Sequence, residues 1–425
     1  MIIRGVVLRV FAIRVVFAVI AVLGLTFSVG KVSSMSGESI PNNLPHPNPG
    51  GKAATFSTQG HVNLTGEYFQ AQGTNGRSCV SCHIPEEAWS INPGTLQDLF
   101  DQTGGTHPVF NILDANNPNM DVSTPTARLA AYSMLLSRGV FRRGGPPRPN
   151  SEWELIAVED PHGFASLERL VHWRRVMPTI NFAQGSATVN WDGGNSVGVD
   201  QLAGLNNQAA RNITGAQQGL PAPPEVIADI VNFERTLSTA QLIVPGVGRL
   251  DSDSARGGPE QLSRMEKTFG RFDLFDAWVD HPNPRRAQIA RGQAIFNSTN
   301  ANGRTCNGCH NSANNGTNIG NALFDIRTAS LAARTADLPL YTFRNRSTGE
   351  TRQLTDAGRG NITGLWSDLG KFKTPTLRAL AARAPYFHNG IAPTLTDVVL
   401  HYEKHLLFVY TDQERADLIA FLNAL

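Results

Sequence analysis

All four cysteines of this 425-residue chain lie in two Cys-x-x-Cys-His motifs. The motifs are Cys79-Val80-Ser81-Cys82-His83 and Cys306-Asn307-Gly308-Cys309-His310. This spacing is typical of covalent c-type haem attachment, in which both thiols add to the haem vinyl groups and the histidine binds the iron. We therefore expect two covalently bound haem c groups, with His83 and His310 as proximal ligands.

Other uses of paired cysteines explain the motifs less well. A tetrahedral zinc site normally has a far shorter linker than the segment between Cys82 and Cys306. A thioredoxin-like redox pair does not need the histidine that follows each second cysteine. A disulfide across only two intervening residues is a strained closure. Haem attachment accounts for both motifs and leaves no cysteine over.

The N-terminal 35 residues predict export. Arg4, Arg9 and Arg14 precede an apolar run from Val15 to Val29, which is followed by polar sequence. This order is typical of a secretory signal, and the run is short for a membrane span of about 20 residues. No clear cleavage site is visible, so an uncleaved N-terminal membrane anchor stays open. In both cases we predict a periplasmic protein, and the net charge of +2 gives no reason to expect a nucleic-acid partner.

The two motifs lie in a repeated sequence context. Asn-Gly-Arg precedes both haem motifs, and Phe69 and Phe296 each lie ten residues before the first cysteine of a motif. We expect helices near 62–71 and 285–298 to pack these rings onto haem. Each half also closes with apolar residues at helical spacing, and Thr411 with Glu414 forms a capping box for the last helix. The repeat predicts a mainly α fold of two cytochrome c-like haem domains, with strands rare or absent.

We place the domain boundaries from composition and from the repeat. Residues 36–58 are rich in proline, asparagine and glycine and are predicted to be a linker. The first haem domain then spans 59–245, with an insertion within 84–172, and the second spans 262–425. The glycine-rich stretch 245–261 is expected to connect them.

Longer strings resemble a known family. The first half contains Pro178-Thr179 and then Trp191-Asp192-Gly193, and the second contains Lys373-Thr374-Pro375-Thr376-Leu377-Arg378 and Ala384-Pro385-Tyr386-Phe387-His388-Asn389-Gly390. Over roughly residues 60–425 the chain is similar to the bacterial di-haem cytochrome c peroxidases and their MauG-like relatives. The resemblance implies that the first haem reacts with peroxide, that the second transfers electrons, and that Trp191 lies between them.

The distal ligands are expected to differ between the two haems. In the peroxidases a methionine follows the His-x-Gly glycine by twelve residues; here that position is Tyr402, and no methionine follows Met265. The resemblance implies the MauG-like tyrosine ligand, with His401 or His405 as the alternative. By the repeat, the first-half equivalent of Tyr402 is Leu205, which cannot bind iron and predicts a vacant position. Some family members have a distal histidine there, and His107, His162 and His172 are the histidines between the first haem motif and Pro178.

Peroxide cleavage also needs polar groups beside the first haem. The family has a glutamine ten residues after the tryptophan, which gives Gln201, and a glutamate ten further on, where this chain has Arg211. A guanidinium is a poor proton shuttle, and Gln208 is a second candidate for the pocket. The family also binds calcium through two carbonyls, here Arg383 and Pro385, and an asparagine replaced here by Val176. Calcium is thus possible but unsupported.

These features predict an exported di-haem oxidoreductase. Hydrogen peroxide would bind at the first haem. Electrons would come from a small c-type cytochrome or cupredoxin, or from a protein or organic substrate. Two alternatives stay open: a non-enzymatic di-haem electron carrier and a di-haem oxygenase that acts on an organic substrate.

Overall fold

The computed structural model describes residues 37–425, which contain both helices and strands in quantity. Ten α-helices and thirteen β-strands occur among these residues, so the fold is mixed α/β and the mainly α prediction is wrong. The predicted signal or anchor lies outside the described residues. Within 37–425, no helix combines the length and apolar character that a membrane crossing requires. Contacts join these residues into one unit, and the two proposed haem domains stay a prediction.

Six of the ten described helices begin after a residue whose side chain accepts a hydrogen bond from a free backbone N–H group of the first turn. In the first half the helices are α1 Pro93–Thr103, α2 Pro125–Ala131, α3 Ser133–Arg138, α4 Gln201–Thr214 and α5 Pro224–Thr236. In the second they are α6 Pro259–Ser263, α7 Pro284–Asn297, α8 Gly360–Thr363, α9 Leu395–Leu406 and α10 Asp412–Asn423. The capping box of Thr411 with Glu414 is confirmed at the start of α10. Of the two helices expected before the haem motifs, α7 forms, whereas the helical part of 62–71 is a 3-10 turn at Glu67–Phe69.

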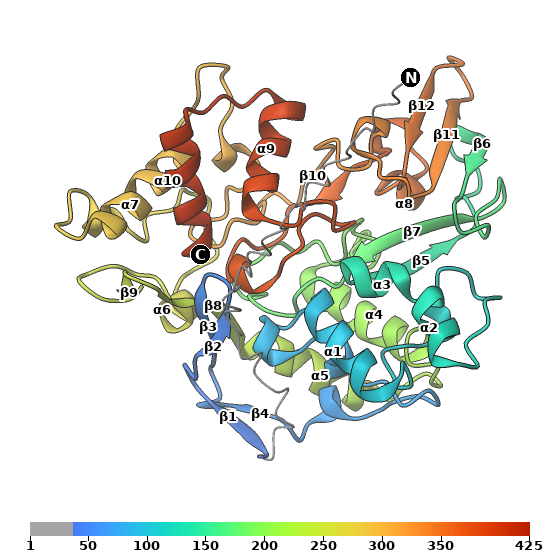
Figure 1. Cartoon of the computed structure of the whole chain (residues 1–425), viewed down its shortest axis with the longest axis horizontal. Helices are drawn as coiled ribbons and strands as arrows, with labels where there is room; N and C mark the ends of the chain where they lie inside the picture. Colours follow the sequence, from blue (N-terminus) through green and yellow to red (C-terminus); the bar gives the residue numbers. More distant parts are fainter. Residues whose placement is uncertain (1–36) are drawn as a thin grey trace, which may run out of the picture. The chain divides into compact units, whose positions relative to one another are not determined.

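Each haem motif lies beside its own apolar core. In the first half, α4 and α5 pack their apolar faces with Tyr68 and Trp89. In the second half, α7, α9 and α10 lie together (Figure 1) and bury Phe272, Phe296 and Phe421. Phe69 packs against the first core, and the ring of Phe296 lies 6.0 Å from that of His310. Phe69 thus packs in the core that also contacts Cys79, and Phe296 lies beside His310, whereas the packing of both rings onto haem stays a prediction.

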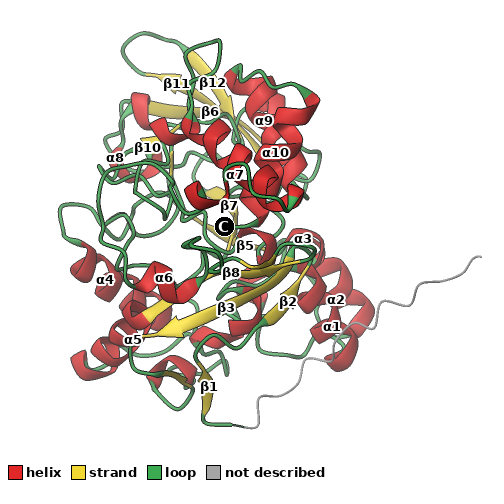
Figure 2. Cartoon of the chain, turned by 90° about the vertical axis from the view of Figure 1, so that its left-hand side faces the viewer, coloured by secondary structure: helices red, strands yellow, loops and turns green. Residues whose placement is uncertain are grey.

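The segment expected to be a linker carries strands. Its strands are β1 Ser39–Pro41, β2 His46–Asn48 and β3 Gly51–Ser57, and β1 pairs with β4 His61–Asn63. In the order β2-β3-β8-β9, β3 pairs antiparallel with β8 Leu237–Val244, next to β9 Gly248–Arg249 (Figure 2). Thr55 and Thr239 face each other, with 2.8 Å between their hydroxyl oxygens. The small and β-branched residues of β3 suit a strand that is buried against β8. The local composition of the segment does not reveal this pairing, because the partner strand is far away in the sequence.

Further strands join the insertion to the second half. The insertion contributes β5 Val140–Gly145, β6 Trp153–Glu159 and β7 Leu170–Arg175; the second half contributes β10 Leu323–Phe324, β11 Leu340–Asn345, β12 Thr351–Leu354 and β13 Phe372–Lys373. The sheets are β12-β11-β6, β5-β7 and β10-β13. Because β6 pairs with β11, the insertion and the second haem region share a sheet. These strands bring β7 and the residues after it to the space between the two haem motifs.

Candidate haem and peroxide site

The first haem motif borders a cavity of about 440 Å³. His83 lies on its wall, and the other walls come from β5, β7, α4 and the loop at 176–195. A smaller space of about 80 Å³ also contacts His83 and contains Cys79 and Cys82 on its wall. The two spaces together border all three groups that would hold a haem, so these residues fit haem attachment.

Each motif histidine has one ring nitrogen next to a backbone carbonyl. Nδ1 of His83 lies 3.0 Å from the oxygen of Trp89, and Nδ1 of His310 lies 2.6 Å from that of Gly316. Burial lowers the pKa of both histidines to about 4, so both rings are neutral at physiological pH. A neutral ring that donates from Nδ1 presents Nε2 to a metal. Both side chains therefore fit the role of proximal ligand.

The motif cysteines form no disulfide, and their surroundings disfavour charge. Burial raises the pKa of Cys306 to about 11 and also raises the pKa values of Cys79, Cys82 and Cys309. A thioether has no charge to desolvate, so these positions suit sulfur atoms bonded to haem better than free thiolates.

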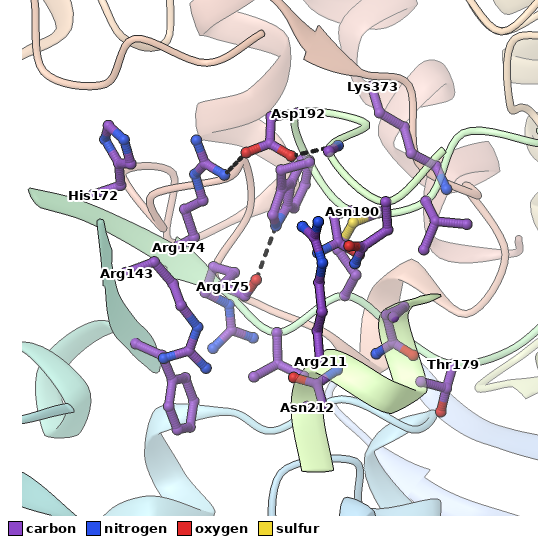
Figure 3. A pocket seen from close by; sticks show the side chains of 18 of the residues that line it. Arg143, His172, Arg174, Arg175, Thr179, Asn190, Asp192, Arg211, Asn212 and Lys373 are labelled. Atoms are coloured by element: carbon purple, nitrogen blue, oxygen red, sulfur yellow. Dashed lines mark hydrogen bonds and ion pairs between the residues drawn. The ribbon is translucent and has the colours of Figure 1, made fainter. Parts of the chain in front are cut away.

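Helix α4 forms the wall that carries the predicted peroxide-handling residues. Leu205, Gln208 and Arg211 all line the cavity, at the three-residue spacing that places side chains on one helix face. Figure 3 shows Arg211 reaching from α4 toward Asn190. Gln201 begins the helix and lies outside the cavity lining. Its amide nitrogen donates to the carbonyls of Phe182 and Ser186, at 2.9 and 3.0 Å.

Basic side chains surround the first cavity. They are Arg143, Arg174, Arg175, Arg211 and Lys373. Burial lowers the pKa of Lys373 to about 8, and its ammonium donates to the carbonyl of Thr188 at 2.5 Å. Of these residues, Arg143 and Arg174 are paired with carboxylates, and the guanidinium of Arg175 donates to backbone carbonyls. Arg211 and Lys373 are thus the lining residues whose charge is complementary to the two carboxylates that haem carries.

The second cavity, of about 230 Å³, lies against the second haem motif. Its lining includes Cys306, Cys309, His310 and Tyr402, together with many apolar side chains. Tyr402, on α9, is half-buried, and the enclosure of its phenol raises the pKa of that group. Neither His401 nor His405 lines this cavity, and Nε2 of His401 lies 2.8 Å from the carbonyl oxygen of Ile326. The geometry thus brings Tyr402 and His310 to one cavity.

Trp191 borders both cavities, as does Lys373. Its indole N–H donates to the carbonyl of Arg175 at 2.8 Å. Its ring lies edge-to-face with that of His388, with 6.3 Å between the centroids. The tryptophan therefore lies where it can contact groups bound in either space.

Comparison with known proteins finds similar sequences among cytochrome c peroxidases and MauG proteins. No family profile matches the chain. A cytochrome-c peroxidase, IdrP1, of Pseudomonas sp. (strain SCT) is 32% identical over 155 residues, which cover 32% of this chain and 39% of that protein. The cytochrome c peroxidase Ccp of Escherichia coli (strain K12) is 30% identical over 169 residues, 39% of this chain and 31% of that protein. The methylamine utilization protein MauG of Methylophilus methylotrophus is 26% identical over 273 residues, 61% of this chain and 69% of that protein.

The chain resembles cytochrome c peroxidases and MauG. The resemblance expected from the sequence is therefore confirmed. The aligned part covers about two fifths of the length of the Pseudomonas peroxidase and about a third of the Escherichia coli one.

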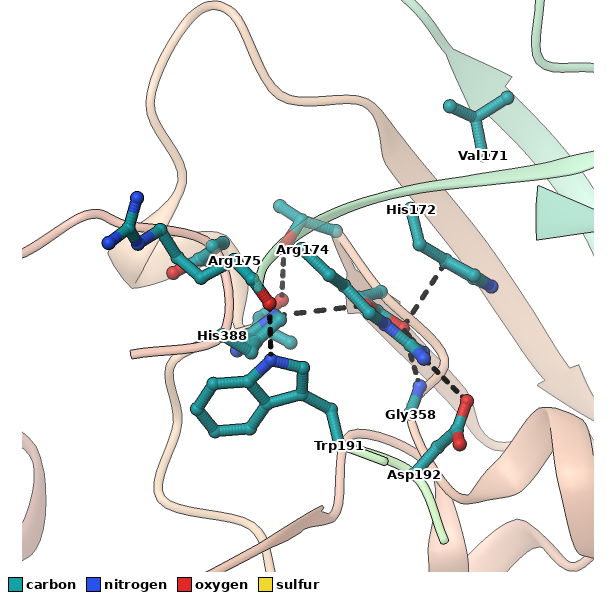
Figure 4. Close-up of polar contacts among 12 residues, drawn as sticks. Val171, His172, Arg174, Arg175, Trp191, Asp192, Gly358 and His388 are labelled. Atoms are coloured by element: carbon teal, nitrogen blue, oxygen red, sulfur yellow. Dashed lines mark hydrogen bonds and ion pairs between the residues drawn. The ribbon is translucent and has the colours of Figure 1, made fainter. Parts of the chain in front are cut away.

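Between the cavities of this peroxidase-like chain lies a buried polar network that the sequence did not reveal (Figure 4). Asp356, after β12, binds Arg174 through both carboxylate oxygens, at 2.8 and 2.9 Å. Arg174 also reaches Asp192 at 2.5 Å. Burial alone would raise the pKa of Asp356, but Arg174 and the neighbouring His172 and His388 hold it far below its usual range. No local pattern marks Asp356, because its partners are distant in sequence.

The histidines considered as distal ligands have other contacts. His172 lines the first cavity, but its Nδ1 lies 3.2 Å from Asp356. Burial lowers its pKa, and the ring contributes to the polar network. His107 and His162 do not line the cavity; Nε2 of His162 lies 3.0 Å from the carbonyl oxygen of Asp337. Leu205 of α4 lines the first cavity and Tyr402 of α9 lines the second, and their equivalence as distal positions stays a prediction.

The residues suggested for calcium do not fit that ion. Val176 is an apolar side chain that packs against a core around Ile91 and Phe141. The carbonyl of Arg383 already accepts a hydrogen bond from the guanidinium of Arg175, at 3.3 Å. An oxygen-seeking cation gains nothing from valine and would compete with this arginine.

Proposed function

We propose that the chain is an exported, periplasmic di-haem c-type oxidoreductase that reduces hydrogen peroxide at its first haem. The supporting observation is an asymmetry between two cavities. Each contains the histidine of a haem motif, but the first presents Leu205 where the second presents Tyr402. A leucine leaves the iron accessible to peroxide, whereas a phenolate oxygen favours ferric iron and closes the position.

The chain's own residues hold the cofactors and handle the substrate. Cys79, Cys82 and His83 would hold the first haem, and Cys306, Cys309 and His310 the second, with Tyr402 as its distal ligand. When bound, haem supplies an iron that exchanges electrons and, where a position is vacant, accepts a ligand. Gln208 and Arg211 reach the cavity from α4 and can orient peroxide by hydrogen bonds. Arg211 stabilises a departing hydroxide but does not shuttle protons, so water would carry the proton.

Trp191 would relay electrons between the two haems. Its indole borders both cavities, and its edge contact with His388 and its hydrogen bond to Arg175 fix its orientation. Electrons would reach the second haem from a small c-type cytochrome or cupredoxin, or from a protein or organic substrate.

The vacant first position is the decisive feature to test. Purified holoprotein is mixed with peroxide in a stopped-flow spectrometer, with and without prior one-electron reduction, and ferric high-spin haem is measured by electron paramagnetic resonance. We expect one high-spin haem and a rapid peroxide reaction. Leu205→His is expected to convert that haem to low spin and abolish the reaction. Ile213→Met is the control, because Ile213 is buried on α4 outside the cavity. If both haems of the wild type are low-spin and do not react with peroxide, the protein is an electron carrier and not a peroxidase.

A further inference from the structure

The guanidinium of Arg175 is surrounded by backbone carbonyls. Nη1 donates to the carbonyls of Arg138 and Gly139, each at 3.2 Å, and Nη2 to those of Arg383 and Ala384, each at 3.3 Å. The residue is 5% exposed, and among residues 37–425 no carboxylate forms an ion pair with it. Burial lowers the pKa of Arg175 to about 10, so the group is still charged at neutral pH.

The four carbonyls come from both halves of the chain. Arg138 and Gly139 connect α3 to β5 within the insertion, whereas Arg383 and Ala384 lie in a loop before α9. Gly139 has φ of +60°, and a Cβ there would lie 2.0 Å from Nη1 of Arg175. Only glycine permits this approach, so the guanidinium is closely enclosed.

Several carbonyl oxygens converging on one positive charge are the arrangement that a hard metal cation uses. A buried charge without such partners is strongly destabilising. Here the positive charge belongs to Arg175, a residue of β7. Its guanidinium donates a hydrogen bond to the carbonyl oxygen of Arg383, which a calcium ion would need as a ligand. The side-chain oxygen that calcium would also need is absent, because Val176 is apolar.

The backbone of Arg175 connects this cluster to the space between the cavities. Its carbonyl accepts the indole N–H of Trp191 at 2.8 Å, and its N–H donates to the carbonyl of His388 at 2.6 Å. Figure 4 shows the guanidinium pointing away from the network around Asp192 while the carbonyl faces Trp191. Anchoring the side chain therefore fixes the backbone group that orients the indole.

We propose that Arg175 is a built-in cation that replaces a bound calcium ion, joins the two halves and positions Trp191. The proposal rests on the proposed function only where Trp191 is taken as the electron relay. If Arg175 takes the place of calcium, the contact between the two halves does not depend on a bound metal ion.

The first test uses the wild-type holoprotein, titrated with EDTA and then with excess calcium chloride. We expect no change in its thermal midpoint or in either haem spectrum, and no calcium binding by calorimetry. A loss of stability in EDTA that calcium reverses would overturn the proposal. This test needs neither peroxide nor an active enzyme, so it separates the proposal from the proposed function.

The second test changes the charge. Arg175→Gln is expected to lose more stability than Arg175→Lys, because glutamine removes the charge; equal losses would contradict the proposal.

Arg378→Gln is the matched control. Arg378 is fully buried, and its guanidinium also donates to carbonyls, those of Asn314, Leu425 and Gly258. We expect Arg378→Gln to lower the stability of the holoprotein without slowing electron transfer between the haems. We expect Arg175→Gln to lower the stability and also to slow electron transfer. Equal transfer rates in these two variants would remove the positioning role of Arg175.

Discussion

The imidazole of His388 lies edge-to-face with the indole of Trp191, at 67° between the planes. On its other side the imidazole stacks on Phe372, with 3.8 Å between the centroids. Burial lowers the pKa of His388 to about 3, so the ring is neutral at physiological pH. The tryptophan between the cavities is therefore held by an uncharged, packed partner from the second half, and its orientation depends on both halves.

Replacing Trp191 by phenylalanine tests the relay. Phenylalanine keeps an aromatic ring but removes the hydrogen bond to Arg175, and we expect slower electron redistribution between the haems after pulsed reduction. The lost bond should also cost about 1 kcal/mol of unfolding free energy. Trp278→Phe is the control, because this buried indole also donates to a carbonyl, that of Ser252, but borders neither cavity. If both variants transfer electrons at the wild-type rate, Trp191 is not the relay.

Replacing Tyr402 by phenylalanine tests the second distal ligand. The half-buried tyrosine lines the second cavity, and no described carboxylate or amine pairs with its phenol. Iron binding would favour its ionised form. We therefore expect Tyr402→Phe to change the spectrum of the second haem while both haems stay attached, as measured by pyridine haemochrome assay. Tyr410→Phe is the control: it lines the same cavity, but its hydroxyl lies 3.7 Å from the sulfur of Cys306. An unchanged Tyr402→Phe spectrum excludes this ligand.

The sequence revealed the parts of the site that depend on local spacing. The haem motifs, Leu205 and Tyr402 lie on cavity walls because fixed offsets within a helix or turn determine which face they share. The strands were missed because β6 pairs with β11 and β3 with β8, far apart in sequence, and no short window encodes such partners. Asp356 was missed for the same reason.

Replacing Asp356 by asparagine tests the buried network. The change removes a negative charge that binds Arg174 through both carboxylate oxygens. Removing one partner of a buried ion pair costs about 3–5 kcal/mol of unfolding free energy. We expect a lower unfolding free energy of the holoprotein in urea. The pKa of Asp356 is held below its unfolded value, so its contribution is present above about pH 4 and lost as the pH falls further. Asp192→Asn, which changes a more exposed partner of Arg174, should cost less. Equal costs would contradict a central role for Asp356.

A buried carboxyl on α5 predicts the opposite pH dependence. Glu234 is 2% exposed, its Oε2 has no hydrogen-bond partner, and burial raises its pKa to about 8. Between the unfolded pKa of about 4.3 and this value the folded chain binds the extra proton. Its stabilising contribution is therefore complete below about pH 4.3 and is lost as the pH rises toward 8. Glu234→Gln should remove this loss, which amounts to about 1.4 kcal/mol per pH unit. Urea unfolding at a series of pH values measures the difference, and parallel curves for the variant and the wild type would show that Glu234 does not titrate in this range.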